Sequence, residues 1–512
     1  MQKSKTKSFT KSAIILAIGS FLCKIIGAVY RVPLTNVLGA RGIGEYQTVF
    51  PLFVILLTIS SGGITQAISS LLSSADREEQ GGLLKAGAIN VGVISLIVGV
   101  FTFLLAPVFS YIQGVESATI GYKILAPIII LSGFSALLKG YFQSKSLVSQ
   151  TTISNLIEQL VKLFVGLSLA IYLKPRGLTY AISGALLGSL IGELGSLLFL
   201  IISYFLDKNK PKISQQNPVN YDFLRVFRTV LPLSLGGLIL PICALLDSIS
   251  IVNVLTFTTG QVDVATSQYG MLSGMVTTLT NLPVVFTVAL GVVVTPVISA
   301  QKRSDSISDK ANLSIKLAIY LCIPISILMI ALAKPIITFL YPNLSPSEQN
   351  LSASLLAVSS LGVTALGVTQ IYSSLLCSTG LSSKSTKNLA ISALIKCVLT
   401  IPSLYAFGIY GACVVTVICY LCSAILNRRT WKKVFGSRSD DIKILTKIVF
   451  CSVLFCFPIY IFANQLNFAL SVGLSALVMV LYLYTTIKLN VFSQKEKQSL
   501  PFFKNRRVKK EN

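Results

Sequence analysis

The residues of this sequence that offer the clearest chemistry are charged side chains inside long apolar stretches. Lys24 and Arg31 stand seven residues apart, which places them on one face of a helix. Lys162 and Lys396 lie in two further apolar stretches. Charges inside a bilayer are costly and usually line a cavity or meet a partner. An excess of positive charge in a cavity predicts an anionic ligand such as a phosphate or diphosphate, because Arg grips phosphate with two hydrogen bonds and Lys acts as a point charge.

Four carboxylates occupy comparable positions, namely Glu45, Glu158, Glu193 and Asp247. We interpret Glu193 and Asp247 either as proton- or sodium-sensitive coupling sites or as counter-ions of the lysines. Glu158 stands four residues before Lys162, so these two residues are either a mutually neutralising structural pair or part of the site. For Glu45 and Arg31, the alternative to a role in the site is that they are ordinary residues at the membrane interface.

Enzymatic chemistry finds little support in the sequence. The chain has no histidine, the commonest general base and metal ligand. It has no Gly-x-x-x-x-Gly-Lys-Ser/Thr phosphate loop and no carboxylate cluster resembling a glycosyltransferase centre. The pair Cys419 and Cys422 lies in an apolar stretch, where a packing role is favoured. We therefore predict a protein that is not an enzyme and that uses no cofactor or metal.

The elements that must position these residues are membrane-spanning helices. Hydrophobic residues make up 53% of the 512 residues, charged residues make up 12%, and the mean hydropathy is +0.77. Apolar runs of about 20 residues are long enough to cross a bilayer, where the backbone must satisfy its own hydrogen bonds as a helix. Fourteen spans are predicted: 10–30, 45–74, 82–110, 121–142, 150–173, 178–206, 223–251, 265–298, 311–332, 348–375, 385–406, 409–428, 442–463 and 467–489.

The net charge of +25 is distributed in a way that indicates a membrane topology. With the N-terminus inside, 33 of the 43 Lys and Arg residues lie in the inner segments and six lie in the outer loops. This bias predicts that both termini are cytoplasmic and that the protein is a multi-pass protein of the cell membrane. Because the positive charge flanks apolar spans, the expected partner is the lipid bilayer, and nucleic acid is not expected.

The chain divides into six, six and two predicted helices. The predicted parts are an N-lobe (1–206), a cytoplasmic linker (207–222), a C-lobe (223–428), a final helix pair (429–490) and a basic cytoplasmic tail (491–512). The two lobes look like repeats. Asn36-Val37-Leu38 after the first helix matches Asn253-Val254-Leu255 after the seventh, and a polar loop follows each. The predicted fold is therefore an all-α integral membrane protein whose lobes are related by a pseudo-two-fold axis along the membrane normal.

Glycine and proline mark expected irregularities within the spans. Pro51 and Gly62-Gly63 are predicted to interrupt the second helix, and Pro283 and Pro296 the eighth. A ridge of small residues on the sixth helix, comprising Gly184, Gly188 and Gly192, is interpreted as a surface for close helix packing.

The stretch from Lys24 to Gln47, KIIGAVYRVPLTNVLGARGIGEYQ, carries a family resemblance. It resembles the first loop region of the polysaccharide biosynthesis and stage V sporulation protein B family. This family belongs to the multidrug/oligosaccharidyl-lipid/polysaccharide exporter superfamily and is related to the lipid II flippases. The predicted helix count, layout and termini agree with that family over essentially the whole chain.

The resemblance implies a flippase that carries undecaprenyl-diphosphate-linked sugars to the outer leaflet by alternating access. In the lipid II flippases basic residues on the first helix line the cavity, and Lys24 and Arg31 match them in kind. Those flippases also use arginines on the second and eighth helices. Here the second helix has no basic residue and the eighth offers only Asn281. This departure leaves Lys162 and Lys396 as hypothetical substitutes.

The leading functional prediction is a flippase for lipid-linked oligosaccharides, with the peptidoglycan precursor lipid II as cargo. Cell-wall synthesis enzymes are candidate partners, in growth or in sporulation. Three alternatives stay open: an exporter of capsule or teichuronic-type oligosaccharide-lipids, a cation-coupled multidrug antiporter, and a scaffold for wall enzymes that transports nothing.

Overall fold

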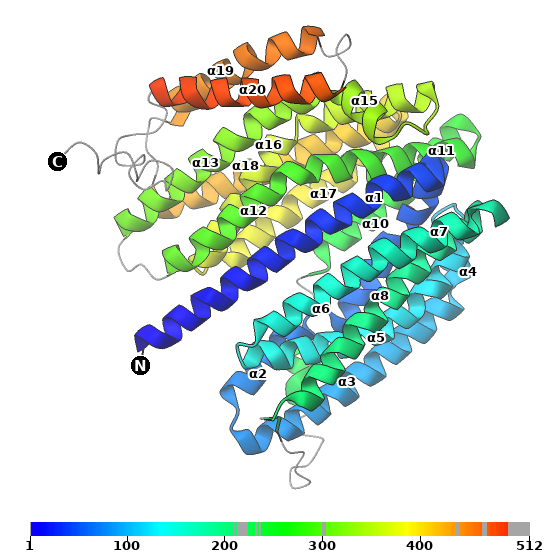
Figure 1. Cartoon of the computed structure of the whole chain (residues 1–512), viewed down its shortest axis with the longest axis vertical. Coiled ribbons are helices and arrows are strands. Elements are labelled where there is room, and N and C mark those ends of the chain that lie inside the picture. Colours follow the sequence, from blue (N-terminus) through cyan, green and yellow to red (C-terminus); the bar gives the residue numbers. More distant parts are fainter. Residues whose placement is uncertain are drawn as a thin grey trace. The chain divides into compact units, whose positions relative to one another are not determined.

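A computed structural model of the chain describes residues 2–208, 210–211, 224–230, 234, 237–299, 304–436, 441–462 and 468–489, and every regular element in these ranges is a helix (Figure 1). The predicted basic tail and most of the predicted linker lie outside the described residues. The chain forms two compact units, of which the first comprises Met1–Leu282, Tyr341–Glu348 and Leu389–Val415, and the second comprises Pro283–Leu340, Gln349–Asn388 and Thr416–Asn512.

The helices up to residue 299 are mostly long. They are α1 (Gln2–Ser61), α2 (Ile64–Ser74), α3 (Arg77–Leu104), α4 (Ala106–Ile112), α5 (Ala118–Ser144), α6 (Val148–Val161), α7 (Leu167–Leu173), α8 (Leu178–Leu206), α10 (Ile239–Thr259), α11 (Val262–Gly270) and α12 (Thr277–Ser299). Two π-helical turns, η1 (Lys162–Gly166) and η3 (Met271–Val276), and a 3₁₀ turn, η2 (Lys174–Arg176), join some of them without a loop.

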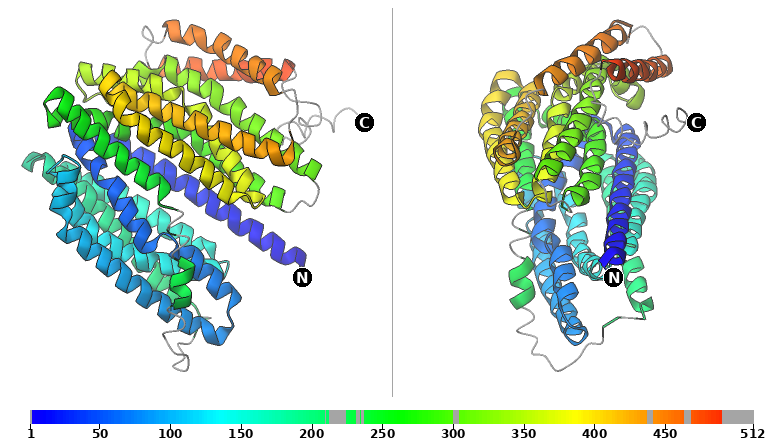
Figure 2. Two further views of the ribbon diagram at one scale, coloured as in Figure 1. Left: turned by 180° about the vertical axis from the view of Figure 1, so that it is seen from behind. Right: turned by 90° about the vertical axis from the view of Figure 1, so that its left-hand side faces the viewer.

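The remaining helices include the C-terminal pair. They are α13 (Ser304–Ala331), α14 (Ala333–Leu340), α15 (Pro346–Ser360), α16 (Val363–Ser378), α17 (Ser382–Phe407), α18 (Ile409–Phe435), α19 (Asp441–Phe462) and α20 (Phe468–Lys488). In the second unit α19 packs on α13 and on α20. Helices α19 and α20 lie side by side in both views of Figure 2. The Tyr320 and Tyr482 rings stack 5.1 Å apart, and the Tyr320 hydroxyl is 2.6 Å from that of Thr486.

Helix α1 folds back on itself at Gly39. This glycine has φ 73° and ψ −179°, a backbone conformation that other residues avoid. Tyr30 and Phe50 would lie about 30 Å apart on a straight helix. Both rings instead lie within 6 Å of the ammonium nitrogen of Lys162, at 5.5 and 5.4 Å. Helix α1 is therefore a hairpin of two arms, in agreement with the separate spans predicted over 10–30 and 45–74.

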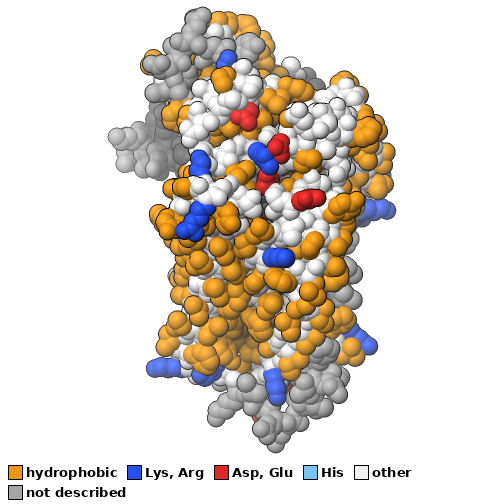
Figure 3. All heavy atoms as spheres, turned by 90° about the vertical axis from the view of Figure 1, so that its right-hand side faces the viewer, with side chains coloured by type: hydrophobic (Ala, Val, Ile, Leu, Met, Phe, Trp, Pro, Cys, Tyr) orange, Lys and Arg blue, Asp and Glu red, His pale blue; other side chains and the backbone are white. Residues whose placement is uncertain are grey.

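Ten helices among the described residues are long and apolar enough to cross a membrane, or eleven when α15 and α16, which meet at a 44° bend, count as one span. Hydrophobic side chains cover a broad continuous area of the face drawn in Figure 3. The count of fourteen spans, the lobe boundaries and the pseudo-two-fold axis stay predictions.

The small-residue ridge on α8 packs closely, as predicted. A Cβ atom added to Gly184 would lie 2.7 Å from the carbonyl oxygen of Leu169, and one added to Gly192 would lie 2.7 Å from that of Glu158. Real Cβ atoms do not approach so closely. The glycines therefore allow the backbone of α8 to contact α6, η1 and α7.

Two sequence predictions about helix breaks were wrong. Pro51 lies inside α1, and α12 continues through Pro283 and Pro296, so these prolines interrupt nothing. The irregularity before α12 is the π-helical turn η3, which proline content does not reveal. The predicted break at Gly62-Gly63 is confirmed, because α1 ends at Ser61 and α2 begins at Ile64.

The predicted seventh helix, 223–251, was placed too early in the chain. A short helical segment, 224–230, buries Val226 and Val230 against α2, α3 and α5, and α10 begins only at Ile239. The intervening sequence contains Pro232 and Gly236-Gly237, which disfavour one continuous helix. Hydrophobicity alone therefore joined two separate helices into one predicted span.

Candidate functional site

The candidate site begins with the basic face of the first arm of α1. The Arg31 guanidinium donates a hydrogen bond from Nη1 to the Thr278 hydroxyl of α12 at 2.8 Å. Lys24 lies two helical turns away on the same face and is exposed. No ion pair involves Lys24 among the described residues. An exposed lysine at this depth of an apolar span requires a polar environment or an anionic partner.

Asn281 lies close to this basic face. It follows Thr278 by three residues on α12, so both side chains share one helix face. The Arg31–Thr278 hydrogen bond brings that face against α1, and Asn281 is exposed beside it. The structure therefore brings together three of the residues predicted from sequence, which are Lys24, Arg31 and Asn281. Their role in binding a substrate stays a prediction.

The loop after α14 also lies beside Arg31. Tyr341 is fully buried, and burial raises the pKa of its hydroxyl while the nearby Arg31 charge opposes that rise. Asn343 donates a hydrogen bond from Nδ2 to the carbonyl oxygen of Asn36 at 3.2 Å. The end of the first arm of α1 is therefore in contact with a loop more than 300 residues away in sequence.

Lys162 lies deeper in the first unit, at the start of the π-helical turn η1. Its ammonium group faces the rings of Tyr30 and Phe50. The described residues show no ion pair between Lys162 and Glu158, although their spacing would permit one. The Lys162 charge is therefore stabilised by aromatic faces in place of a carboxylate.

Glu193 is a buried carboxyl group on α8. It is 6% exposed, and the Ser135 hydroxyl of α5 donates a hydrogen bond to its Oε1 at 2.6 Å. Glu158 on α6 and Lys139 on α5 lie within electrostatic reach of it. Within the described part of the chain neither glutamate forms a salt bridge. A coupling role for Glu158 and Glu193 stays a prediction.

Lys396 on α17 forms an ion pair with Asp247 on α10, and both side chains are mostly buried. Of the two roles predicted for Asp247, the geometry favours that of counter-ion. Tyr269 of α11 is buried nearby, within electrostatic reach of both charges. The partner of Lys396 in this cluster, Asp247, differs from the partner of Arg31, which is Thr278.

The Lys396–Asp247 pair leads to a prediction about stability. Lys396→Met should lower the free energy of unfolding by about 3 kcal/mol, because it leaves Asp247 buried without its partner. Adding Asp247→Asn should restore most of that loss, which the thermal transition of the purified variants would measure. A double variant no more stable than Lys396→Met alone would contradict the counter-ion role.

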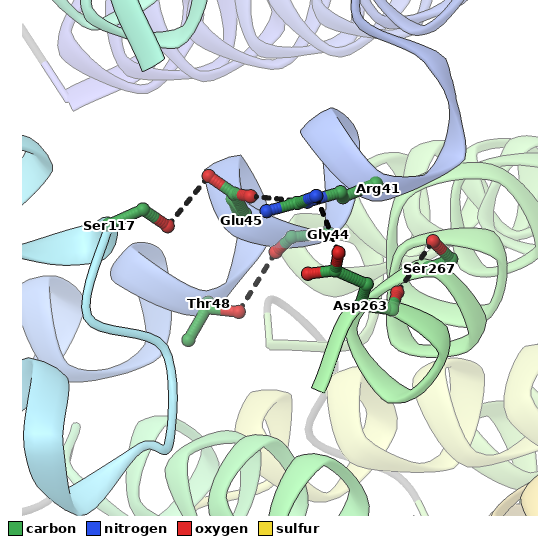
Figure 4. A network of polar contacts seen from close by, with 7 residues as sticks. All are labelled: Arg41, Gly44, Glu45, Thr48, Ser117, Asp263 and Ser267. Atoms are coloured by element: carbon green, nitrogen blue, oxygen red, sulfur yellow. Dashed lines mark hydrogen bonds and ion pairs between the residues drawn. The ribbon is translucent and has the colours of Figure 1, made fainter. Parts of the chain in front are cut away.

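A second polar network joins the turn of α1 to α11 (Figure 4). Arg41 lies between two carboxylates, with Nε 3.0 Å from Glu45 Oε1 and Nη1 2.6 Å from Asp263 Oδ2. The Ser117 hydroxyl donates to the other Glu45 oxygen at 2.7 Å. Sequence reasoning missed Arg41 and Asp263, which are 222 residues apart. The one available signal was that both lie in loops predicted on the same side.

Comparison with known proteins assigns this chain to a family. The family model described as "Polysaccharide biosynthesis protein" matches residues 9–302, which is more than half of the chain. Stage V sporulation protein B of Bacillus subtilis (strain 168) is 28% identical over 61% of this chain and 63% of its own length. The lipid II flippase MurJ of the same organism is 23% identical over 81% of each chain.

Solved structures share the fold. A lipid II flippase MurJ in an inward closed conformation superposes with a TM-score of 0.75 at 18% identity, covering 94% of this chain and 100% of that chain. A multidrug resistance MATE family transporter of the MOP superfamily, in an inward-facing conformation, has a TM-score of 0.66 at 17% identity, covering 85% of this chain and 99% of that one.

The long apolar helices and these likenesses define a multi-pass membrane protein with a fold found in flippases and transporters. The match of the family model makes the assignment specific: the chain belongs to the polysaccharide biosynthesis protein family. The proteins to which this chain is similar include the lipid II flippase MurJ.

Proposed function

We propose that this protein is a flippase that moves undecaprenyl-diphosphate-linked sugar precursors, above all lipid II, from the inner to the outer leaflet of the cell membrane by alternating access. The observation that carries the proposal is the basic face of α1, where exposed Lys24 and hydrogen-bonded Arg31 lie beside exposed Asn281. Arg and Lys bind a diphosphate through charge-assisted hydrogen bonds, and Asn281 offers an amide to the head group. The similarity to the lipid II flippase MurJ supports a lipid-linked cargo.

Both termini are proposed to be cytoplasmic, on the basis of the positive-inside bias of the sequence. With that orientation, the turn of α1 at Gly39 faces outward. The lipid-linked oligosaccharide is then the substrate, and enzymes of cell-wall synthesis are the proposed partners.

Two six-helix lobes are proposed to surround the substrate path. A reciprocal pair of contacts supports the underlying duplication. Asn36, after the first helix, accepts a hydrogen bond from Asn343 in the loop after α14. Asn253, its counterpart in the repeat, donates from Nδ2 to the Ile112 carbonyl oxygen at the end of α4, at 3.1 Å. In both contacts the end of the first helix of one proposed lobe meets a loop of the other, through the Asn36 backbone carbonyl in one case and the Asn253 side chain in the other.

Alternating access requires the outer ends of the proposed lobes to separate. They are joined here by the Arg41–Asp263 ion pair and by close packing of Gly270 against Gly44, where a Cβ added to Gly270 would lie 2.8 Å from the Gly44 Cα. The exposed ion pair is weak on its own. The glycine contact is the larger part of the closed arrangement, because it allows continuous van der Waals packing.

A cross-link across this contact should stop the cycle. We expect Arg41→Cys with Asp263→Cys, joined by a short cleavable bis-maleimide that cannot cross the membrane, to lose more than about 90% of flippase activity, since the outer ends can no longer part. Cleaving the linker should restore activity. Each single-cysteine variant treated in the same way is the control, and full activity of the cross-linked protein would contradict closure at this contact.

Depletion in the host tests the cargo. Lipid II should accumulate in the inner leaflet on depletion, and a plasmid copy of the wild-type gene should restore its distribution. Unchanged lipid II together with accumulation of a capsule or teichuronic-type intermediate would replace lipid II as the cargo and leave the flippase class intact.

A further inference from the structure

Lys162 is a half-buried cation whose surroundings differ from those of the other basic residues. Lys24 is exposed, Arg31 meets a hydroxyl group, and Lys396 meets a carboxylate. The ammonium nitrogen of Lys162 instead lies 5.5 Å from the ring centroid of Tyr30 and 5.4 Å from that of Phe50. Both distances fall within the range in which a cation is attracted to the face of an aromatic ring.

The two rings belong to opposite arms of the α1 hairpin. Tyr30 precedes the turn at Gly39 and Phe50 follows it. Tyr30 is 3% exposed, and Phe50 packs against Tyr46 with ring centroids 4.8 Å apart. A single ammonium group therefore contacts both arms, and it lies on a third helix that belongs to neither arm.

The backbone at Lys162 is irregular, and this irregularity places its side chain between the two arms of α1. Lys162 begins the π-helical turn η1, which ends at Gly166. A Cβ added to Gly166 would lie 3.1 Å from the Tyr30 hydroxyl and 3.4 Å from the Gly188 Cα. The turn is thus packed between the first arm of α1 and α8 at its glycine. π-helical turns shift the side chains around them and are often found at functional sites.

We propose that Lys162 is a positioning residue that clamps the two arms of the α1 hairpin through its contacts with Tyr30 and Phe50, and so sets the direction of Arg31. Successive helical residues point about 100° apart. A Tyr30 ring held against Lys162 therefore turns the adjacent Arg31 toward Thr278. This inference rests on the proposed flippase function for its effect on transport, whereas the clamp itself does not.

The rival role for Lys162 is direct contact with the substrate diphosphate, as the sequence predicted. The two roles predict different results when the attraction between the ring faces and the Lys162 ammonium group is reduced. If Lys162 is a clamp, rings that attract a cation less strongly should lower both stability and activity. If Lys162 binds the diphosphate directly, weaker attraction to the rings should not lower activity.

Fluorinated phenylalanines at position 50 provide the test. One, two or three fluorine atoms withdraw electrons from the ring face and leave its shape nearly unchanged. The series is incorporated in the full-length chain with Lys162 intact and, as the matched control, in Lys162→Met, which keeps an apolar side chain of similar length. Thermal transition and lipid II flipping in liposomes are measured for every member, and Lys162→Arg is added as a conservative variant.

With Lys162 intact we expect the transition temperature to fall stepwise with each fluorine, by about 2 °C in total. Flipping should fall in parallel by about three- to tenfold. In Lys162→Met neither quantity should change along the series. Lys162→Arg should keep at least half of the wild-type activity, because the guanidinium also binds ring faces.

A flat transition temperature along the series with Lys162 intact would overturn the clamp. Stepwise loss of stability with unchanged flipping would overturn the positioning role and leave a structural contact only. A stepwise loss of stability in a protein whose wild type flips no lipid II would uphold the clamp and reject the proposed function, so the two failures can be told apart.

Discussion

Lys24→Glu should abolish flippase activity while leaving the amount of protein in the membrane unchanged. Lys24 is exposed on the basic face of α1 and makes no ion pair among the described residues, so its loss removes no packing. A carboxylate there would repel the substrate diphosphate from Arg31. Reversal of one charge at a polar site should reduce flipping by at least about 100-fold, measured as complementation of a depleted host and as transport in liposomes.

Two controls accompany this variant. Lys24→Arg keeps the charge and should retain most activity. Lys174→Glu makes the same change of charge at an exposed residue of the turn η2, far along the sequence from the basic face, and should leave activity within about twofold of wild type. Full complementation by Lys24→Glu would remove Lys24 from the site.

Gly188→Ala should destabilise the protein, although alanine normally favours a helix over glycine. A Cβ on residue 188 would lie 2.5 Å from the Gly166 backbone nitrogen, and no flexible side chain stands there to move aside. Helix α8 and the turn η1 must therefore separate. The expected loss in the free energy of unfolding is about 2–3 kcal/mol, measured from the thermal transition of the purified protein.

The matched control is a glycine on the same helix, for which alanine should not lower the free energy of unfolding. A Cβ on Gly195 would meet its nearest neighbour, the Ile157 Cγ2 atom, at an ordinary 3.5 Å. Gly195→Ala should therefore be neutral or stabilising by up to about 1 kcal/mol, the difference in helix propensity. Equal destabilisation by both substitutions would show that the contact with Gly166 is not what makes residue 188 sensitive.

Much of the fold follows from the sequence, because apolar length and periodicity reflect the bilayer directly. The two arms of α1 and the close packing of Gly184, Gly188 and Gly192 were predictable in this way. The start of α10 was not, because the segment 224–230 also carries hydrophobic residues, of which Val226 and Val230 pack on other helices. The π-helical turns have no simple sequence signal, since they reflect packing against neighbouring backbones.

The candidate site was only partly predictable for a similar reason. Hydropathy identifies which charges lie within spans or at their ends, and so it identified Lys24, Arg31, Lys162 and Lys396. It cannot identify their partners, which depend on helix packing. Lys396 meets a carboxylate 149 residues away, and Lys162 meets two rings that become neighbours only because α1 folds back at Gly39.

The central claim is most directly tested by reconstituting the purified protein into liposomes that carry lipid II and measuring how much lipid II a membrane-impermeant probe can reach over time. The proposed function predicts that wild-type protein brings inner-leaflet lipid II to the outer leaflet, and that Lys24→Glu liposomes behave like liposomes without protein. Access that is the same for wild type, Lys24→Glu and protein-free liposomes would contradict it.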